Sequence, residues 1–94
     1  MKIWKYDLDA DRSDEWVTVE MPGLAEAGFL SVGIQRGVPV LWAQINQSAP
    51  LVKRRYWAAT TGSPIPIPLD ARFLGTIQMF DDTFVLHVFA EDPL

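Results

Sequence analysis

Three consecutive cations, Lys53, Arg54 and Arg55, lie in a predicted strand that ends in a run of hydroxyl side chains. This run, Thr60-Thr61-Gly62-Ser63, offers hydroxyls and flexible backbone amides. Cations, hydroxyls and amides are the groups that hold phosphate oxygens in proteins. The segment has neither the lysine nor the following helix of a P-loop. It therefore predicts a phosphate site of another kind, built from Lys53, Arg54, Arg55, Thr60, Thr61 and Ser63.

Each part of this prediction has a structural alternative. Long basic side chains often lie over apolar surface and extend only their charges into water. Serine and threonine hydroxyls often cap their own turns. Alternation along a strand also places Lys53 and Arg55 on one face and Arg54 on the other, so the three cations cannot all serve one pocket within one protomer.

Aromatic rings are a second candidate for ligand contact, because flat rings stack on nucleobases and also dominate protein interfaces. Of the four tryptophans, we expect three to lie in the core or in subunit contacts. Trp42 differs, because its predicted strand face also carries Gln44, whose amide could read a base edge. Gln78 and His87 are further candidates for contact with a base or a ribose.

Catalytic and metal chemistry has little support in this composition. The chain has no cysteine and one histidine, His87, so thiolate zinc sites and cysteine nucleophiles are excluded and a histidine zinc shell is incomplete. The alternate carboxylates of Asp7–Asp11 resemble a calcium loop, but Arg12 and Thr18 stand where such loops need glycine and a bidentate glutamate. We therefore expect a protein that is not an enzyme and has no metal site and no cofactor.

Segments rich in β-branched and aromatic residues alternate with turn signals along the whole chain. No long run has a helical period, and only Leu24–Gly28 is a candidate for a single helical turn. We predict one all-β domain over residues 1–94, with about seven antiparallel strands in a small sandwich or a partly closed barrel. The predicted strands are Lys2–Asp7, Trp16–Glu20, Phe29–Gln35, Val38–Asn46, Val52–Thr60, Arg72–Phe80 and Thr83–Ala90.

Two predicted hairpins, Phe29–Asn46 around Arg36-Gly37 and Arg72–Ala90 around Asp81-Asp82, carry apolar side chains on both faces. A sheet in a monomer usually presents a polar face to water, so we expect the second face to be covered and predict a homo-oligomer. In the first hairpin one face carries Leu30, Val32, Ile34, Leu41, Ala43 and Ile45, and the other carries Phe29, Ser31, Gly33, Val40, Trp42 and Gln44. In the second hairpin one face carries Phe73, Ile77, Met79, Phe84, Leu86 and Val88, and the other carries Leu74, Thr76, Gln78, Val85, His87 and Phe89.

The run from Pro64 to Pro68 is stiff and apolar, and its three prolines donate no amide hydrogen. We expect it to pack as an arm over its own domain or over a neighbouring subunit.

The net charge of −4 argues against non-specific nucleic-acid binding, because general affinity for phosphates needs a basic surface. The acidic residues are concentrated between Asp7 and Glu15, where they suit a basic partner. The alternating start is unlike a signal peptide, and no segment approaches the ~20 apolar residues of a membrane helix. Because the chain has no cysteine, it fits a reducing cytoplasm.

Short motifs over nearly the whole chain resemble a family of short proteins of unknown function encoded by tailed phages and prophages. The resemblance implies expression in the cytoplasm of an infected bacterial host, among accessory proteins that often antagonise host immunity. It implies no catalytic residue. The matching pieces are the opening M-K-I-W-K-Y, L-S-V-G-I-Q-R-G-V-P-V-L-W-A at Leu30–Ala43, Ala49-Pro50, T-G-S-P-I at Thr61–Ile65, F-L-G-T-I-Q at Phe73–Gln78 and F-V-L-H-V-F at Phe84–Phe89.

Residues and resemblance together predict a non-enzymatic phage protein that self-associates and blocks a bacterial defence by binding. In the first hypothesis, pockets of the homo-oligomer sequester a nucleotide immune signal, with the basic strand on the phosphates and Trp42, Gln44, Gln78 or His87 at the base or ribose. In the second, the acidic surface docks on a host defence protein, as an anti-CRISPR-like inhibitor would. In the third, the protein is a small virion or assembly component.

Overall fold

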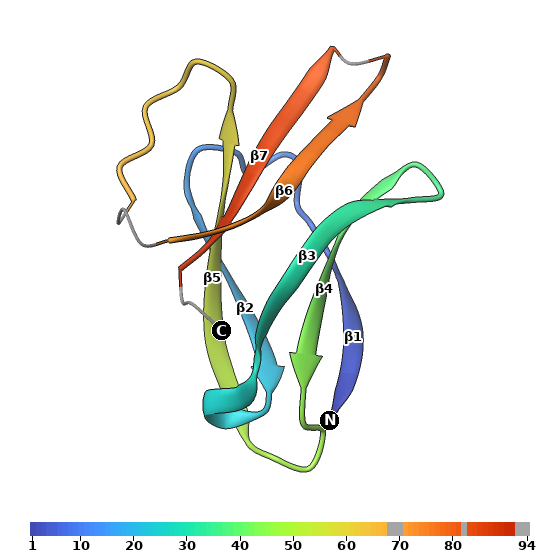
Figure 1. Ribbon diagram of the computed structural model, residues 1–94, viewed down its shortest axis with the longest axis vertical. Helices are drawn as coiled ribbons and strands as arrows, with labels where there is room; N and C mark the ends of the chain where they lie inside the picture. Colours follow the sequence, from blue (N-terminus) through green and yellow to red (C-terminus); the bar gives the residue numbers. More distant parts are fainter. Residues whose placement is uncertain (68–70, 82, 92–94) are drawn as a thin grey trace.

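Residues 1–67, 71–81 and 83–91, the part of the chain that the computed structural model describes, form seven strands in two antiparallel sheets (Figure 1). Sheet A has the strand order β1-β4-β3, and sheet B has the order β2-β5-β7-β6. This arrangement confirms the predicted all-β class and, within the described residues, is a two-sheet sandwich and not a closed barrel. The elements are β1 (Lys2–Asp7), β2 (Trp16–Pro22), the 3-10 helix η1 (Leu24–Glu26), β3 (Gly28–Gln35), β4 (Val38–Ile45), β5 (Leu51–Thr60), β6 (Arg72–Met79) and β7 (Phe84–Ala90). Pro68 of the predicted arm and Asp82 of the second predicted turn lie outside the described residues.

The connection between β3 and β4 is the two-residue turn that the sequence predicts. Gln35 and Val38 pair across it, and both central residues have a positive φ, 53° at Arg36 and 78° at Gly37. Two consecutive positive φ angles are characteristic of the type I′ turn, whose twist matches that of a β-hairpin. The turn fixes the register of β4 and therefore the face on which each of its side chains lies.

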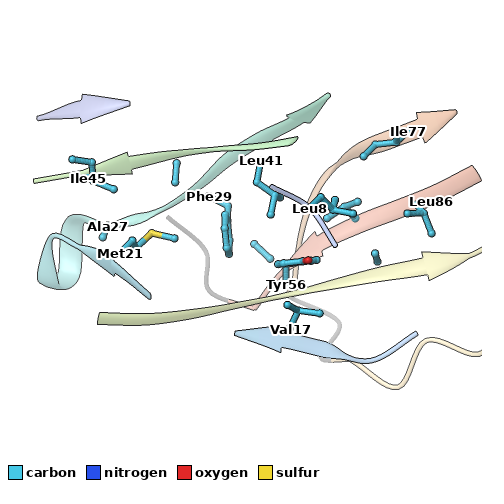
Figure 2. Packing of buried hydrophobic residues seen from close by; sticks show 14 residues of the cluster. Leu8, Val17, Met21, Ala27, Phe29, Leu41, Ile45, Tyr56, Ile77 and Leu86 are labelled. Atoms are coloured by element: carbon cyan, nitrogen blue, oxygen red, sulfur yellow. The ribbon is translucent and has the colours of Figure 1, made fainter. Parts of the chain in front are cut away.

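One layer of apolar side chains fills the space between the sheets (Figure 2). Met21 of β2, Leu41 of β4 and Tyr56 of β5 are each 0 % exposed. The ring of Phe29 in β3 meets the ring of Tyr56 edge-on, with centroids 5.8 Å apart. The phenol oxygen of Tyr56 accepts a 3.1 Å hydrogen bond from the backbone N–H of Asp9, so this buried hydroxyl has a partner.

Bulges in β3 and β6 place two phenylalanines on the faces opposite to those that simple alternation predicts. The register of β3 shifts just after Phe29, which pairs with Ala43 and is buried in the core. The register of β6 shifts just after Phe73, which pairs with Phe89 on the outward face of sheet B. The predicted faces of Phe29 and Phe73 are therefore wrong, because one extra residue in a strand reverses the alternation beyond it.

The two bulged strands, β3 and β6, lie against each other, and Gly75 is a point of close approach between the sheets. A Cβ atom at Gly75 would lie 3.0 Å from Cγ2 of Val32 in β3, and the φ of Gly75 is 149°, in the region that favours glycine. Arg72, at the start of β6, donates a hydrogen bond to the carbonyl oxygen of Phe29 in β3. A glycine and an arginine of β6 therefore bring this strand into close contact with β3.

Beyond this contact the free ends of the two hairpins diverge (Figure 1). Ile34 and Gly37 from one hairpin and Met79 and Phe80 from the other line an apolar hollow of about 280 Å³. Phe80 is 72 % exposed at this end of the molecule. The sandwich is thus closed in its middle and open at the hairpin ends.

The role of Gly75 predicts the cost of adding one methyl group to it. Gly75→Ala should lower the free energy of unfolding by about 1–3 kcal/mol more than Gly62→Ala does, because overpacking carries a cost of that size. Gly62 is the control: its φ of 90° also lies in the region that L side chains rarely adopt, but nothing lies within 4 Å of its added Cβ. Urea unfolding of both variants measures the difference. Equal losses would show that backbone strain alone requires a glycine at position 75.

Candidate functional site

The structure divides the ten predicted ligand-binding residues among four places. Trp42 and Gln44 lie on the outward face of sheet A, as the pairing of β4 with β1 and β3 shows. Arg54 points to the opposite side of β5 from Lys53 and Arg55, as alternation predicts. Thr60 and Ser63 lie together at the end of β5. The outward face of sheet B carries Lys53, Arg55, Gln78 and His87, with Thr61 beside His87.

Arg54 binds backbone carbonyls of the segment that contains η1. Its Nε and Nη2 atoms donate 2.8 Å hydrogen bonds to the carbonyl oxygens of Ala27 and Leu24, respectively. A third bond of 3.1 Å joins Nη1 to the carbonyl oxygen of Lys53. The guanidinium therefore holds η1 against β5, and its predicted contact with a phosphate would have to compete with these bonds.

Arg55 lies between a carboxylate and an aromatic ring. Its Nε atom donates a 2.8 Å hydrogen bond to Glu91, and Nη2 forms an ion pair with the same carboxylate. The centre of the guanidinium is 4.4 Å from the ring centroid of Trp16, which is the geometry of a cation–π contact. The hydrogen bonds from Arg55 lower the pKa of Glu91. The charge of Arg55 thus has a partner within its own chain.

The hydroxyl run at the end of β5 binds an anion, and this anion is the carboxylate of Asp14. Asp14 accepts hydrogen bonds from the hydroxyl of Thr60 at 2.6 Å and from its backbone N–H at 3.0 Å. The hydroxyl of Ser63 lies 2.6 Å from that of Thr60 and makes a longer contact of 3.4 Å with Asp14. These hydrogen bonds lower the pKa of Asp14, and the bond from the Thr60 hydroxyl has the largest effect. Hydroxyl and amide groups that suit an anion are therefore present at the end of β5, but the Asp14 carboxylate of the same protein binds them.

His87 joins two threonine hydroxyls across sheet B. Its Nε2 atom lies 2.8 Å from Oγ1 of Thr61, and its Nδ1 atom lies 3.0 Å from Oγ1 of Thr76, the residue that alternation places opposite it. A neutral imidazole donates a hydrogen bond through one nitrogen and accepts one through the other, so one threonine hydroxyl accepts from the ring and the other donates to it. The ring thereby connects the loop after β5 to β6 and β7.

Four rings form a row across the outward face of sheet B, which we call the aromatic row: Trp16, Trp57, Phe89 and Phe73. The centroids of Trp16 and Trp57 are 5.4 Å apart, and those of Phe73 and Phe89 are 5.3 Å apart. Trp57 is 8 % exposed and Phe73 is 55 % exposed. Sequence alternation did not indicate the complete row, because the bulge in β6 is what brings Phe73 to this face.

A polar hollow of about 470 Å³ lies on the outward face of sheet A, near the β3–β4 turn, and includes two cations that the sequence did not single out. Lys5 of β1 donates a 2.6 Å hydrogen bond to Oε1 of Gln35 at the end of β3. On the same face, Trp42 lies so close over Gly33 that a Cβ added to this glycine would be 2.7 Å from the ring. Thirty positions separate Lys5 from Gln35, so only the strand register could have indicated the site. The hollow is lined by Lys5, Asp7, Gln35, Arg36, Val38 and Val40.

These features define a small all-β sandwich domain in which both outward faces carry aromatic side chains with charged or polar neighbours. The whole chain, residues 1–94, matches a family described as a domain of unknown function (DUF7352), and the protein belongs to that family. No curated protein and no solved structure matches the chain. The expected membership of a family of unknown function is confirmed, and the phage origin stays a prediction.

Two further observations concern only residues 1–67, 71–81 and 83–91. In this part of the chain no three histidine, cysteine or acidic side chains are grouped as a metal site would require. Nor does it contain a helix with the length and apolar character needed to span a bilayer.

The Asp14 contacts predict a specific dependence of stability on pH. Asp14→Asn keeps a residue that tolerates the positive φ of 58° but removes the charge, and near neutral pH it should lower the free energy of unfolding by about 1 kcal/mol. Because the pKa of Asp14 is lowered by folding, its contribution is complete above the unfolded value of about 3.9 and is lost as the pH falls below it. The difference between wild type and Asp14→Asn should therefore shrink in acid.

Denaturant unfolding at neutral pH and near pH 3 measures this difference. Asp11→Asn is the control, since it removes an exposed carboxylate from the same loop and should change stability little at either pH. A difference for Asp14→Asn that persists undiminished in acid would show that the charge of Asp14 does not cause it.

Proposed function

We propose that this protein is a non-enzymatic binding protein that assembles with copies of itself and sequesters a nucleotide signal, as a phage accessory protein that acts against a host defence. The observation that carries the proposal is the aromatic row on the outward face of sheet B. The phage setting is supported by the sequence resemblance described above, and the ligand class by the aromatic and cationic side chains on the outward faces.

A second copy of this chain suits the aromatic row. Rings such as the half-exposed Phe73 are typical anchors of protein interfaces. Both signs of charge lie on the same face, with Lys53 opposite Glu20 and Arg55 bonded to Glu91. In an isologous contact each copy offers the same patch, and a patch with both signs avoids repulsion between like charges. The row therefore supports self-association through sheet B.

Assembly through sheet B would leave the outward face of sheet A for a ligand. This face holds Trp42 and Gln44, the ring and the amide that the sequence predicts at a nucleobase. The amide nitrogen of Gln44 donates a 2.8 Å hydrogen bond to the carbonyl oxygen of Glu26, which leaves its own carbonyl oxygen as an acceptor. Trp42 and Gln44 thus support a ligand role for sheet A, and the aromatic row supports an assembly role for sheet B.

Binding to a host defence protein is the second candidate, and the connection between β1 and β2 favours it. Asp9, Asp11 and Glu15 are exposed there, although Glu15 is paired with Arg12 at 2.8 Å. Exposed carboxylates in one loop attract a basic partner and increase the rate of encounter more than the final affinity.

Mass spectrometry of the protein purified from bacterial cells separates these functions. Heat denaturation should release a nucleotide into the supernatant if the protein sequesters one. A stoichiometric host protein without a nucleotide would favour the second candidate. Recovery of the protein with neither would favour the virion or assembly role.

Self-association should depend on the aromatic row. Light scattering at micromolar concentration should show at least a dimer for wild type. Phe73→Asp should weaken the association at least about 30-fold, because it replaces an interface anchor by a charge. Phe80→Asp is the control: Phe80 is 72 % exposed but lies in the β6–β7 turn, outside the row. A wild-type monomer, or equal effects of the two substitutions, would contradict this interface.

A further inference from the structure

The polar hollow on sheet A has an apolar floor and charged walls. Val40, at 2 % exposure, lies on β4 between Asp7 of β1 and Gly33 of β3. Val38, the next outward-facing residue of β4, is 48 % exposed. A volume of about 470 Å³ is within the ~300–1,000 Å³ range of small-molecule sites. The hollow is therefore large enough for one small ligand with an apolar part.

The Lys5 side chain crosses this floor. Lys5 is paired with Trp42, whereas Gln35, its hydrogen-bond partner, is paired with Val38 at the other end of the hollow. The outward-facing residue of β4 between these two pairs is Val40, so the Lys5 stem passes over β4 at Val40. An ammonium group has three donors, and one bond to Gln35 leaves two for a ligand.

Arg36 gives the hollow its second cation at a defined position. The residue is the first of the type I′ turn, where its φ of 53° and the pairing of Gln35 with Val38 fix its backbone. Lys5 and Arg36 line the same hollow, and Asp7 is the carboxylate beside them. The site has an excess of one positive charge, with donors for an anion and one acceptor for a hydroxyl or an amine.

We infer that this hollow binds a phosphate monoester of mononucleotide size, with the phosphate between Lys5 and Arg36. Asp7 accepts a hydrogen bond from a sugar hydroxyl or a ring amine, and the planar ring lies on the exposed side chain of Val38 and on the Lys5 stem that covers Val40. This inference rests on the proposed function, because it gives the sequestered nucleotide its place. It differs from the sequence prediction, which put the phosphate on the basic strand of residues 53–55.

Three probes separate the parts of the ligand: adenosine monophosphate, inorganic phosphate and adenosine. Isothermal titration calorimetry at low salt should show that adenosine monophosphate binds more tightly than either part alone. Lys5→Gln/Arg36→Gln should lower its affinity at least about tenfold, because removing even one charge-assisted hydrogen bond weakens binding by about that factor or more. Lys2→Gln/Arg12→Gln makes the same two replacements elsewhere and should leave the affinity unchanged.

Circular dichroism and thermal unfolding check that both double variants are folded. If both double variants bind adenosine monophosphate like wild type, a nucleotide binds elsewhere, and the inference fails while the proposed function stands. If inorganic phosphate binds as tightly as adenosine monophosphate, the ring part of the inference is wrong. If wild type binds none of the probes and purified protein releases no nucleotide, both the inference and the proposed sequestration fail.

Discussion

The contact between β3 and β6 determines how the two sheets lie on each other. Gly75 allows the backbone of β6 to approach Val32, and Arg72 binds the carbonyl oxygen of Phe29 in the facing strand. The bulges in both strands turn Phe29 into the core and Phe73 out of it. One ring of the core, Phe29, and one ring of the aromatic row, Phe73, therefore owe their faces to the strands that make this contact. A methyl group added at Gly75 would therefore affect more of the fold than a methyl group added at Gly37 or Gly62, where nothing lies within 4 Å of the added Cβ.

Charged groups hold the loops of this small domain in place. Arg54 fastens η1 to β5, Arg55 fastens Glu91 after β7, and Asp14 fastens the β1–β2 connection to the end of β5. Each contact joins segments that are far apart in the sequence, so each restricts a loop in the folded state. Guanidinium and hydroxyl groups can also bind an external anion, but here they bind groups of the chain itself. Lys5 and Arg36, by contrast, are two cations that line an open hollow on sheet A.

Local patterns in the sequence predict most of the strands and the Arg36-Gly37 turn, because alternation and turn chemistry depend on neighbouring residues. They do not predict the bulges, since one extra residue changes a face without changing the composition of the strand. The opposite faces of Arg54 and Arg55 were also predictable from alternation. Their long-range partners were not, because Leu24 and Ala27, which bind Arg54, and Glu91, which binds Arg55, are far from these arginines in the sequence. The hollow at Lys5 is beyond local patterns for the same reason.

Lys5 belongs to β1, which pairs only with β4 and forms one border of sheet A in the described residues. Strands at a border exchange their amide hydrogens through local opening more readily than central strands do. Separation of β1 from β4 would carry Lys5 and Asp7 away from Gln35 and Arg36, which belong to the β3–β4 hairpin. The hollow therefore loses two of its lining residues when β1 frays. A molecule that bridges Lys5 and Arg36 would hold β1 on the sheet and make this fraying less frequent.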